Sequence, residues 1–166
     1  MALLDKRWTL EELHKLPDDG NRYEVVRGEL FVTPAPRRSH EIILARLDEI
    51  LMPYVRANNL GLVFHRAIIR FDGSQEEPDL AVQQVHSITE SNWDTAPTPM
   101  LVVEVLSDVT RWRDLGAKRE LYRGAGVAYY WVVDEEAKSV RVVRSGMPDV
   151  LVTGEMQWRP VAAADC

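Results

Sequence analysis

Two acidic residues and one lysine stand out because of the segments in which they lie. Asp79 follows Pro78 directly before a short apolar run, and Glu104 interrupts the otherwise apolar run 100–106. Lys118 follows in a helix-like segment. An ionised carboxylate within an apolar run costs several kcal/mol unless another group pairs with it. Two acids and an ammonium group on separate elements therefore predict a metal site with a nearby cation.

The expected metal is magnesium. If the strands that carry Asp79 and Glu104 are neighbours in one sheet, their carboxylates can point into one cleft. Hard cations such as Mg²⁺ are held by one or two carboxylates together with waters and substrate phosphate oxygens, so two acids suffice. The backbone carbonyl of Val105 is a candidate for a further oxygen ligand.

Each of these residues alone also has an ordinary structural explanation. The tripeptide Glu77-Pro78-Asp79 is typical of a simple strand entry, and a lysine on a charged helix is usually solvated. A buried acid such as Glu104 is often paired with an arginine, and the chain offers Arg66, Arg70 and Arg111 for this. Only the combination of the three residues favours a site.

The composition indicates a soluble, globular, cytoplasmic protein. The chain has 166 residues, of which 46% are hydrophobic and 28% charged, which predicts one domain over 1–166 with its core at about 10–160. No apolar run approaches the roughly 20 residues that a membrane helix needs, and the first residues do not resemble a signal peptide. The only cysteine, Cys166, excludes an intrachain disulfide and a thiolate cluster.

The first half of the chain predicts two helices and several strands. Thr9 and Glu12 form a capping box for a short helix to about Leu16. Strands at 23–26 and 29–33 are expected to form a hairpin, whose turn type stays open because Arg27 is poorly suited to a positive φ. Ser39 is expected to cap a second helix, which Pro53 either ends or kinks. Its apolar residues recur with a 3.6-residue period: Ile43, Leu44, Leu47, Ile50 and Leu51.

The second half predicts the centre of the fold. Residues 60–71 are expected to form one long strand with a bend near His65 and Arg66, and 80–82 a short one, before a loop at 87–99. The run 100–106 is typical of a central strand buried on both faces. A helix over 113–123 and a strand over 127–133 complete a βαβ crossover. Further antiparallel strands are expected at 139–143, 150–153 and 156–158, so the predicted class is α/β with a mixed sheet.

An ordered series of motifs resembles a known family. The series begins with Tyr23-Glu24-Val25-Val26, Gly28-Glu29-Leu30, Pro34 and His40. It continues with Glu77-Pro78-Asp79, the run 102–107, Arg113-Asp114, Lys118, Leu121-Tyr122, Ala125-Gly126-Val127 and the run 130–134. Over roughly residues 10–143 the chain is similar to the Uma-type endonuclease-like family, formerly a domain of unknown function, in the PD-(D/E)XK restriction-endonuclease-like superfamily.

The resemblance implies a restriction-endonuclease-like mixed β-sheet core flanked by helices, and a magnesium-dependent nuclease in which Mn²⁺ can substitute. By this resemblance Asp79 and Glu104 are metal ligands. The usual lysine position, two residues after the second acid, is occupied by Leu106, so Lys118 on the following helix is expected to orient the attacking water or stabilise the phosphate. His40 is implied as an acid–base group or a phosphate ligand, or else has no catalytic task. The roles of Glu24, Glu29 and Tyr122 stay open.

The expected function is hydrolysis of DNA phosphodiester bonds by a metal-activated water, with a homodimer as the candidate assembly. The net charge of −6 argues against general adhesion to nucleic acid, although the segment 111–123 has a local net charge of +3 and, with Arg37 and Arg38, predicts a basic rim. One alternative is a noncatalytic module that keeps the fold and binds nucleic acid or protein. A weaker one is a hydrolase for a small phosphorylated ligand, against which the lack of a glycine-rich phosphate loop counts.

Overall fold

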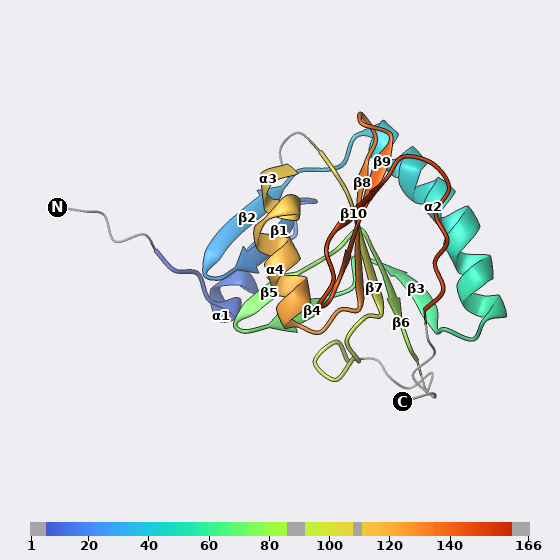
Figure 1. Cartoon of the computed structure of the whole chain (residues 1–166). Helices are drawn as coiled ribbons and strands as arrows, with labels where there is room; N and C mark the ends of the chain where they lie inside the picture. Colours follow the sequence, from blue (N-terminus) through green and yellow to red (C-terminus); the bar gives the residue numbers. More distant parts are fainter. Residues whose placement is uncertain (1–5, 86–91, 108–110, 161–166) are drawn as a thin grey trace.

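The chain folds into two β-sheets with helices packed against them, as the computed structural model shows (Figure 1). The structure describes residues 6–85, 92–107 and 111–160. The predicted loop at 87–99 therefore lies partly outside the described residues. No helix within the described ranges is both long and apolar enough to cross a membrane.

The larger sheet has six strands in the order β10-β9-β8-β7-β6-β3. Their bounds are β3 Leu62–His65, β6 Leu80–Gln83, β7 Leu101–Val105, β8 Tyr129–Asp134, β9 Ser139–Arg144 and β10 Val150–Val152. The pair β7 and β8 is parallel and the other neighbouring strands of this sheet pair antiparallel, so the sheet is mixed as predicted. The parallel pair is connected by the helices α3 (Arg111–Leu115) and α4 (Ala117–Gly124).

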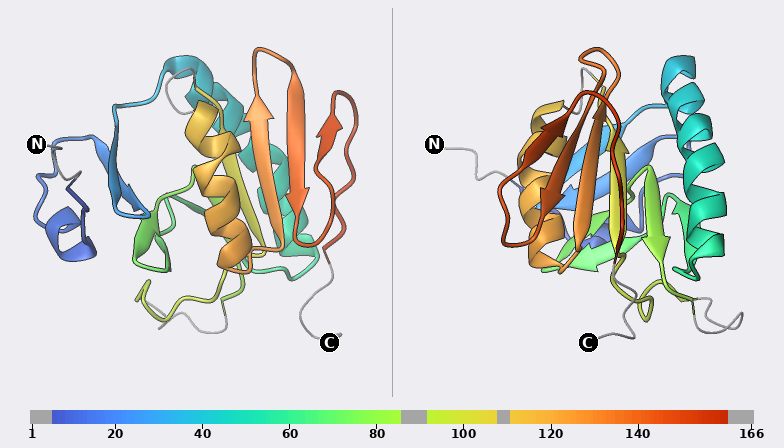
Figure 2. Two further views of the ribbon diagram at one scale, coloured as in Figure 1. Left: turned by 60° about the vertical axis from the view of Figure 1, so that its left-hand side comes forward. Right: turned by 45° about the vertical axis from the view of Figure 1, so that its right-hand side comes forward.

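Helices cover both faces of this sheet (Figure 2). On one face, α2 (Arg38–Ala57) buries Leu44, Leu51 and Val55 against a cluster that includes Leu101 and Trp131. On the other face, Leu121 and Tyr122 of α4 pack in a second cluster with residues of β7, β8 and β9. Both faces of β7 are thus covered, and all five of its residues are buried, which confirms the predicted central strand.

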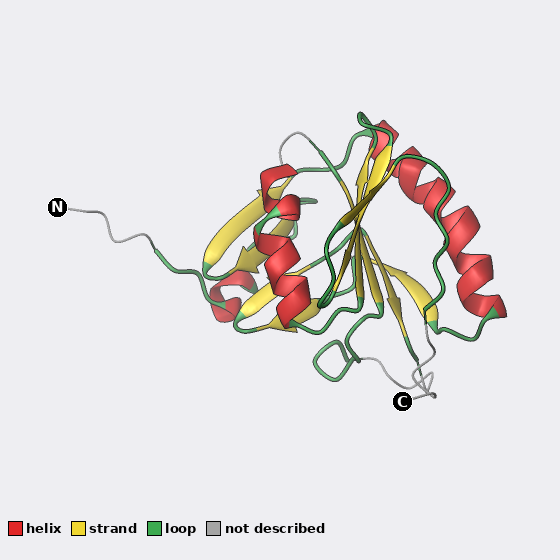
Figure 3. Cartoon of the chain, viewed as in Figure 1, coloured by secondary structure: helices red, strands yellow, loops and turns green. Residues whose placement is uncertain are grey.

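The smaller sheet has four strands in the order β2-β1-β5-β4 and lies on the α4 side of the molecule (Figure 3). Its strands are β1 Arg22–Val26, β2 Glu29–Thr33, β4 Ile69–Phe71 and β5 Ser74–Glu76. The hairpin β1–β2 turns through Arg27 and Gly28 at φ values of 51° and 86°, so both turn residues have positive φ. This is the backbone pattern of a type I′ turn, and Arg27 adopts it despite its side chain.

Several local predictions are confirmed. The capping box at Thr9 is present and starts α1 (Leu10–Leu13), although the helix ends three residues before the predicted limit. Of the two alternatives left open for Pro53, the structure excludes an end of the helix there, since α2 continues to Ala57. The hairpin and the strand–helix–strand unit around β7 also form as expected.

Four local predictions are wrong. Residues 60–71 are not one strand, because Arg66 takes a left-handed φ of 52° and the chain passes from one sheet to the other. The predicted helix over 113–123 is broken at Gly116, whose flexible backbone ends α3 and begins α4. The helix α2 starts at Arg38, with Arg37 as an N-cap that provides no side-chain hydrogen bond, in place of Ser39. Residues 156–158 form no strand.

Candidate active site

The alternation of side chains along β7 places Glu104 on the face that α4 covers. Val103 and Val105 point toward α2, whereas Val102 packs in the cluster that contains residues of α4. Glu104 lies one step further on the same side as Val102 and is only 3% exposed. An ionised carboxylate there requires partners, and α4 provides them.

Those partners are the two α4 side chains one turn apart. Lys118 Nζ donates to Glu104 Oε1 at 2.6 Å, and the Tyr122 hydroxyl donates to the same oxygen at 3.0 Å. The lysine therefore reaches the second acid from the following helix, as the sequence predicted. Burial raises the pKa of Glu104 to about 7, with the charge of Lys118 opposing this effect and nearby Asp79 reinforcing it.

Asp79 lies beside Glu104, directly before the neighbouring strand β6. Leu80 of β6 pairs with Val103 of β7 in an antiparallel register, so one further step along each strand brings Asp79 opposite Glu104. Residues directly opposite each other in such a pair have Cβ atoms about 5 Å apart. The two acids of the prediction are thus neighbours across β6 and β7.

The Asp79 carboxylate is held by three other residues. Arg22 donates to Oδ1 from Nη1 at 3.1 Å and from Nη2 at 3.0 Å. The backbone N–H of Val105 donates to Oδ2 at 2.8 Å, and His40 Nε2 lies 3.0 Å from the same oxygen. Burial alone would raise the pKa of Asp79, but the hydrogen bond to His40 and the charge of Arg22 lower it to about 2.

His40 lies in the first turn of α2 and faces the two acids. Its Nε2 is bonded to Asp79, and its Nδ1 lies 3.4 Å from Glu41 Oε1. Partial burial lowers the pKa of His40, yet the interaction with Asp79 outweighs this, so the pKa of His40 is raised overall. A protonated or neutral ring with Nε2–H toward Asp79 is consistent with this geometry.

Behind Glu104 lies a buried charged cluster, formed by Glu24 of β1, Glu76 of β5, Arg113 of α3, and Lys118. Lys118 is 0% exposed, and its Nζ lies 3.1 Å from Glu24 Oε1 and 3.0 Å from Glu76 Oε2. Arg113 Nη2 lies 3.1 Å from Glu24 Oε2. The cluster therefore joins the smaller sheet to the helices that carry Lys118 and Arg113.

The pKa values of Glu24 and Glu76 are shifted in opposite directions. Burial raises the pKa of Glu24, but Lys118 and Arg113 lower it to about 2. Burial and the charge of Glu24 hold the pKa of Glu76 well above its usual range, against the effect of Lys118. A neutral Glu76 can donate a hydrogen bond to the ionised Glu24, which is consistent with these opposite pKa shifts.

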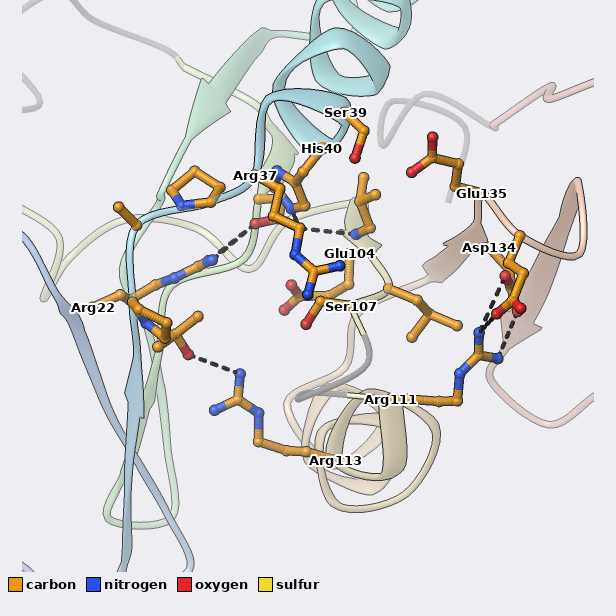
Figure 4. A pocket seen from close by; sticks show the side chains of 18 residues that line it. Arg22, Arg37, Ser39, His40, Glu104, Ser107, Arg111, Arg113, Asp134 and Glu135 are labelled. Carbon is orange, nitrogen blue, oxygen red and sulfur yellow. Dashed lines mark hydrogen bonds and ion pairs between the residues drawn. The ribbon is translucent and has the colours of Figure 1, made fainter.

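A pocket of about 620 Å³ opens in front of the two acids (Figure 4). Asp79, Glu104 and His40 line it, together with Arg22 and Arg113. The remaining wall comes from residues 33–37 and Ser39, from residues 105–107 and Arg111, and from the acidic turn 134–136. Lys118, Tyr122 and Glu24 do not line the pocket, so the lysine points to Glu104 and not into the space where a substrate would lie.

The predicted basic rim is formed only in part: Arg37 and Arg38 are exposed and Arg37 lines the pocket, whereas the cations of the segment 111–123 have acidic partners. Arg113 and Lys118 are buried in the charged cluster, and Arg119 pairs with Asp149 at 2.8 Å. Arg111 Nη1 lies 2.7 Å from Asp134 Oδ2. Arg123 is 3.6 Å from Glu120. Because these cations already have acidic partners, the local positive charge counted in the sequence does not form an open cationic surface.

Sequence analysis did not identify two residues of the site, Arg22 and Glu76. Arg22 directly precedes the motif that begins at Tyr23. It lies two residues before Glu24 on β1, so the two side chains point to the same face of the strand, and this spacing could have indicated it. Glu76 lies in the polar strand β5, which has no apolar alternation to mark it. Glu29, whose role was open, is exposed at the start of β2 and does not line the pocket. Arg66 and Arg70, considered as partners of Glu104, pair with Glu77 and Gln75 instead.

The carboxylate oxygens of the site suit a hard cation such as Mg²⁺. Glu104 can bind one as it lies, whereas Asp79 can do so only after a change in its hydrogen bonds. Glu104 lines the pocket, and the hydrogen bonds from Lys118 and Tyr122 both go to its Oε1. In the described ranges, no group of three or more histidine, cysteine, aspartate or glutamate side chains is already arranged as a metal site. The Asp79 oxygens both carry hydrogen bonds, so a metal ligand role for Asp79 requires one of its present partners to move.

Comparison with known proteins identifies the family. The model of the Uma2 family, described as "Putative restriction endonuclease", matches residues 10–162. No curated protein matches the chain significantly. A crystal structure titled as that of "a putative nuclease belonging to DUF820" from Anabaena variabilis ATCC 29413 is similar with a TM-score of 0.77. The match covers 93% of this chain and 89% of that chain at 19% sequence identity, which supports a shared fold. The chain therefore belongs to the Uma2 family and has a restriction-endonuclease-like α/β fold.

Proposed function

We propose that the protein is a magnesium-dependent endonuclease that hydrolyses DNA phosphodiester bonds. The observation that carries the proposal is the pair Asp79, directly before β6, and Glu104 on β7, which line one pocket, with Lys118 bonded to Glu104. Membership of the family described as "Putative restriction endonuclease" supports the same reaction class.

In this proposal Asp79 and Glu104 hold the Mg²⁺ ion, and the backbone carbonyl of Val105 is the candidate third protein ligand. When bound, such an ion lowers the pKa of a water molecule and neutralises charge on the phosphoryl oxygens. Acidic pockets bind phosphodiesters only when a cation offsets the carboxylates, which explains how a protein with a net charge of −6 can act on DNA.

The protein's own residues prepare the site. Lys118 is a positioning residue: its ammonium fixes Glu104 Oε1 and leaves the other carboxylate oxygen for the pocket. Tyr122 holds the same oxygen from the next turn of α4. His40 lines the pocket with Nε2 directed to Asp79, so it can donate a proton near the scissile phosphate or orient Asp79.

One observation favours a second candidate, a noncatalytic nucleic-acid or protein-binding module. The Asp79 carboxylate is engaged by Arg22, His40 and Val105, an arrangement that is complete without a metal ion. A folded protein that binds DNA, but neither binds Mn²⁺ at millimolar concentration nor cleaves, is the result that this candidate predicts.

Plasmid cleavage tests the proposed function. Purified protein is expected to convert supercoiled plasmid to open-circular or linear forms in Mg²⁺ or Mn²⁺, and to do nothing in EDTA. A Lys15→Met variant, altered at an exposed ion pair with Glu11, is the purification control and should cleave like the wild type. Absence of cleavage by the folded wild type with either metal ion overturns the proposal. Light scattering on the same preparation tests the predicted homodimer.

Metal affinity is expected to depend on pH through Glu104. The burial that raises the pKa of Glu104 to about 7 leaves this ligand mostly protonated at pH 6 and mostly ionised at pH 8. Since metal binding requires the ionised carboxylate, the Mn²⁺ affinity should fall about tenfold from pH 8 to pH 6. Asp79, with a pKa of about 2, stays ionised over this range, but protonation of His40 beside it, whose pKa is raised, weakens metal binding at low pH in the same direction. Calorimetric titration with Mn²⁺ at several pH values measures this change in affinity. An affinity that does not change with pH contradicts the assignment of Glu104 as a metal ligand.

A further inference from the structure

The Asp79 carboxylate has no acceptor position left for a metal ion. Oδ1 accepts from both Arg22 Nη atoms, at 3.1 and 3.0 Å, and Oδ2 accepts from Val105 N at 2.8 Å and lies 3.0 Å from His40 Nε2. An ionised carboxylate offers about four lone-pair sites in total. A cation can bind Asp79 only after one of these partners leaves.

Of the partners of Asp79, Arg22 is the one that a bound metal ion should displace. The N–H of Val105 belongs to the backbone of the central strand β7 and is fixed in place. The His40 ring can lose its charge and remain as a neutral donor. The Arg22 guanidinium cannot lose its charge, so it would repel a divalent ion bound to the same oxygen.

The pocket gives Arg22 room to move. Its side chain is 14% exposed and lines the pocket of about 620 Å³, with the guanidinium extending toward His40 in Figure 4. Besides Asp79 it contacts the backbone oxygen of Glu77, to which Nη1 donates at 2.5 Å. Rotation about the arginine side-chain bonds can therefore carry the guanidinium from Asp79 into the pocket without moving β1.

We propose that Arg22 occupies the place of the metal ion at Asp79, is displaced when the ion binds, and then binds a phosphate of the substrate. This inference rests on the metal dependence proposed above. A guanidinium matches two phosphate oxygens with two parallel N–H donors, so the displaced group gains a favourable anionic partner. Arg22 therefore opposes metal binding while the pocket is empty and favours the substrate once the metal ion is present.

Removing the charge of Arg22 should consequently change metal and substrate binding in opposite directions. In calorimetric titrations of the full chain with Mn²⁺, Arg22→Gln is expected to bind the ion at least about tenfold more tightly than the wild type, which corresponds to about 1.4 kcal/mol. At saturating Mn²⁺ the same variant should show a higher KM for DNA. Arg22→Met is a second neutral variant, used alongside circular dichroism to show that the fold is kept.

Two further variants test whether the gain in Mn²⁺ affinity arises at Asp79. Arg66→Gln alters a cation that pairs with Glu77 at 2.8 Å, two residues from Asp79, and should leave Mn²⁺ affinity unchanged. Adding Asp79→Asn to Arg22→Gln should cancel the gain, because the freed ligand is then absent. A gain that persists in this double variant means that the ion binds elsewhere and overturns the proposal.

The remaining outcomes separate this inference from the proposed function. Equal or weaker Mn²⁺ affinity in both neutral Arg22 variants overturns the exchange, even if the wild type cleaves DNA. A failure of the wild type and of every variant to bind Mn²⁺ overturns it as well. Tighter Mn²⁺ binding in a protein that never cleaves DNA supports the exchange at Asp79 and overturns the nuclease proposal.

Discussion

Glu104→Gln is expected to reduce DNA cleavage by at least about a hundredfold, because it removes the charge of a proposed metal ligand while keeping its shape. Replacing even the outer partners of metal ligands commonly costs 10- to 100-fold in affinity or activity, and a direct ligand should cost no less. The glutamine oxygen can still accept from Lys118 and Tyr122, the donors that now lie 2.6 and 3.0 Å from Glu104 Oε1, so the local packing is preserved.

The measurement is the initial rate of plasmid nicking in Mg²⁺, together with calorimetric titration of Mn²⁺. Glu135→Gln is the matched control, since Glu135 also lines the pocket but is exposed on the turn between β8 and β9. It should keep a rate within a few-fold of the wild type. Undiminished cleavage by the Glu104 variant would exclude Glu104 from the reaction and point to a contaminating nuclease.

Lys118→Met is expected to lower the free energy of unfolding by about 3–5 kcal/mol, the range observed when one partner of a buried ion pair is removed. The ammonium group, 0% exposed, lies within 3.1 Å of Glu24, Glu76 and Glu104. Methionine fills a similar volume, so the loss reports the missing charge. The carboxylates left behind can be relieved only by taking up protons.

Because these carboxyl groups take up protons, the loss of unfolding free energy in Lys118→Met depends on pH. The folded variant retains protons on these carboxyl groups that the unfolded chain releases, so its stability relative to the wild type falls as pH rises. Urea unfolding at pH 5 and pH 8 should show the larger deficit at pH 8. Lys15→Met, which breaks an exposed pair with Glu11 at 2.6 Å, should change stability by less than about 1 kcal/mol. Equal stability of wild type and Lys118→Met at pH 8 would contradict the charged cluster.

The central unit of the fold was predictable because its signals are local. The apolar run around Glu104 indicated a strand covered on both faces, and the glycines after Arg123 ended the following helix where the structure ends it. The position of Lys118 beside Glu104 was expected from the family resemblance, because the usual lysine position is occupied by Leu106. Of the residues that hold Asp79, His40 was expected from the family resemblance, but Arg22 was not predictable, because it lies 57 positions earlier in the chain and in a different sheet.

The division into two sheets could not be predicted from local patterns either. Residues 60–71 look continuous, yet Arg66 changes the backbone direction and Ile69 belongs to the smaller sheet. The strand β5, Ser-Gln-Glu, is polar in sequence but fully buried, because Lys118 and the neighbouring strands satisfy its side chains. Pairing between distant charged residues decides such positions, and a pattern of apolar residues does not contain that information.

The long separation between the partners of Lys118 has a consequence for the newly made protein. The bond between Lys118 and Glu24 joins residues 94 positions apart, and Glu24 lies on the first strand while Lys118 lies on the last helix of the described chain. Glu24 is synthesised long before Lys118, whereas Glu104 lies only 14 positions before the same lysine. Contacts of such high sequence separation also form late in folding. A chain truncated before α4 would therefore contain Glu24 and Glu104 without the lysine that joins them.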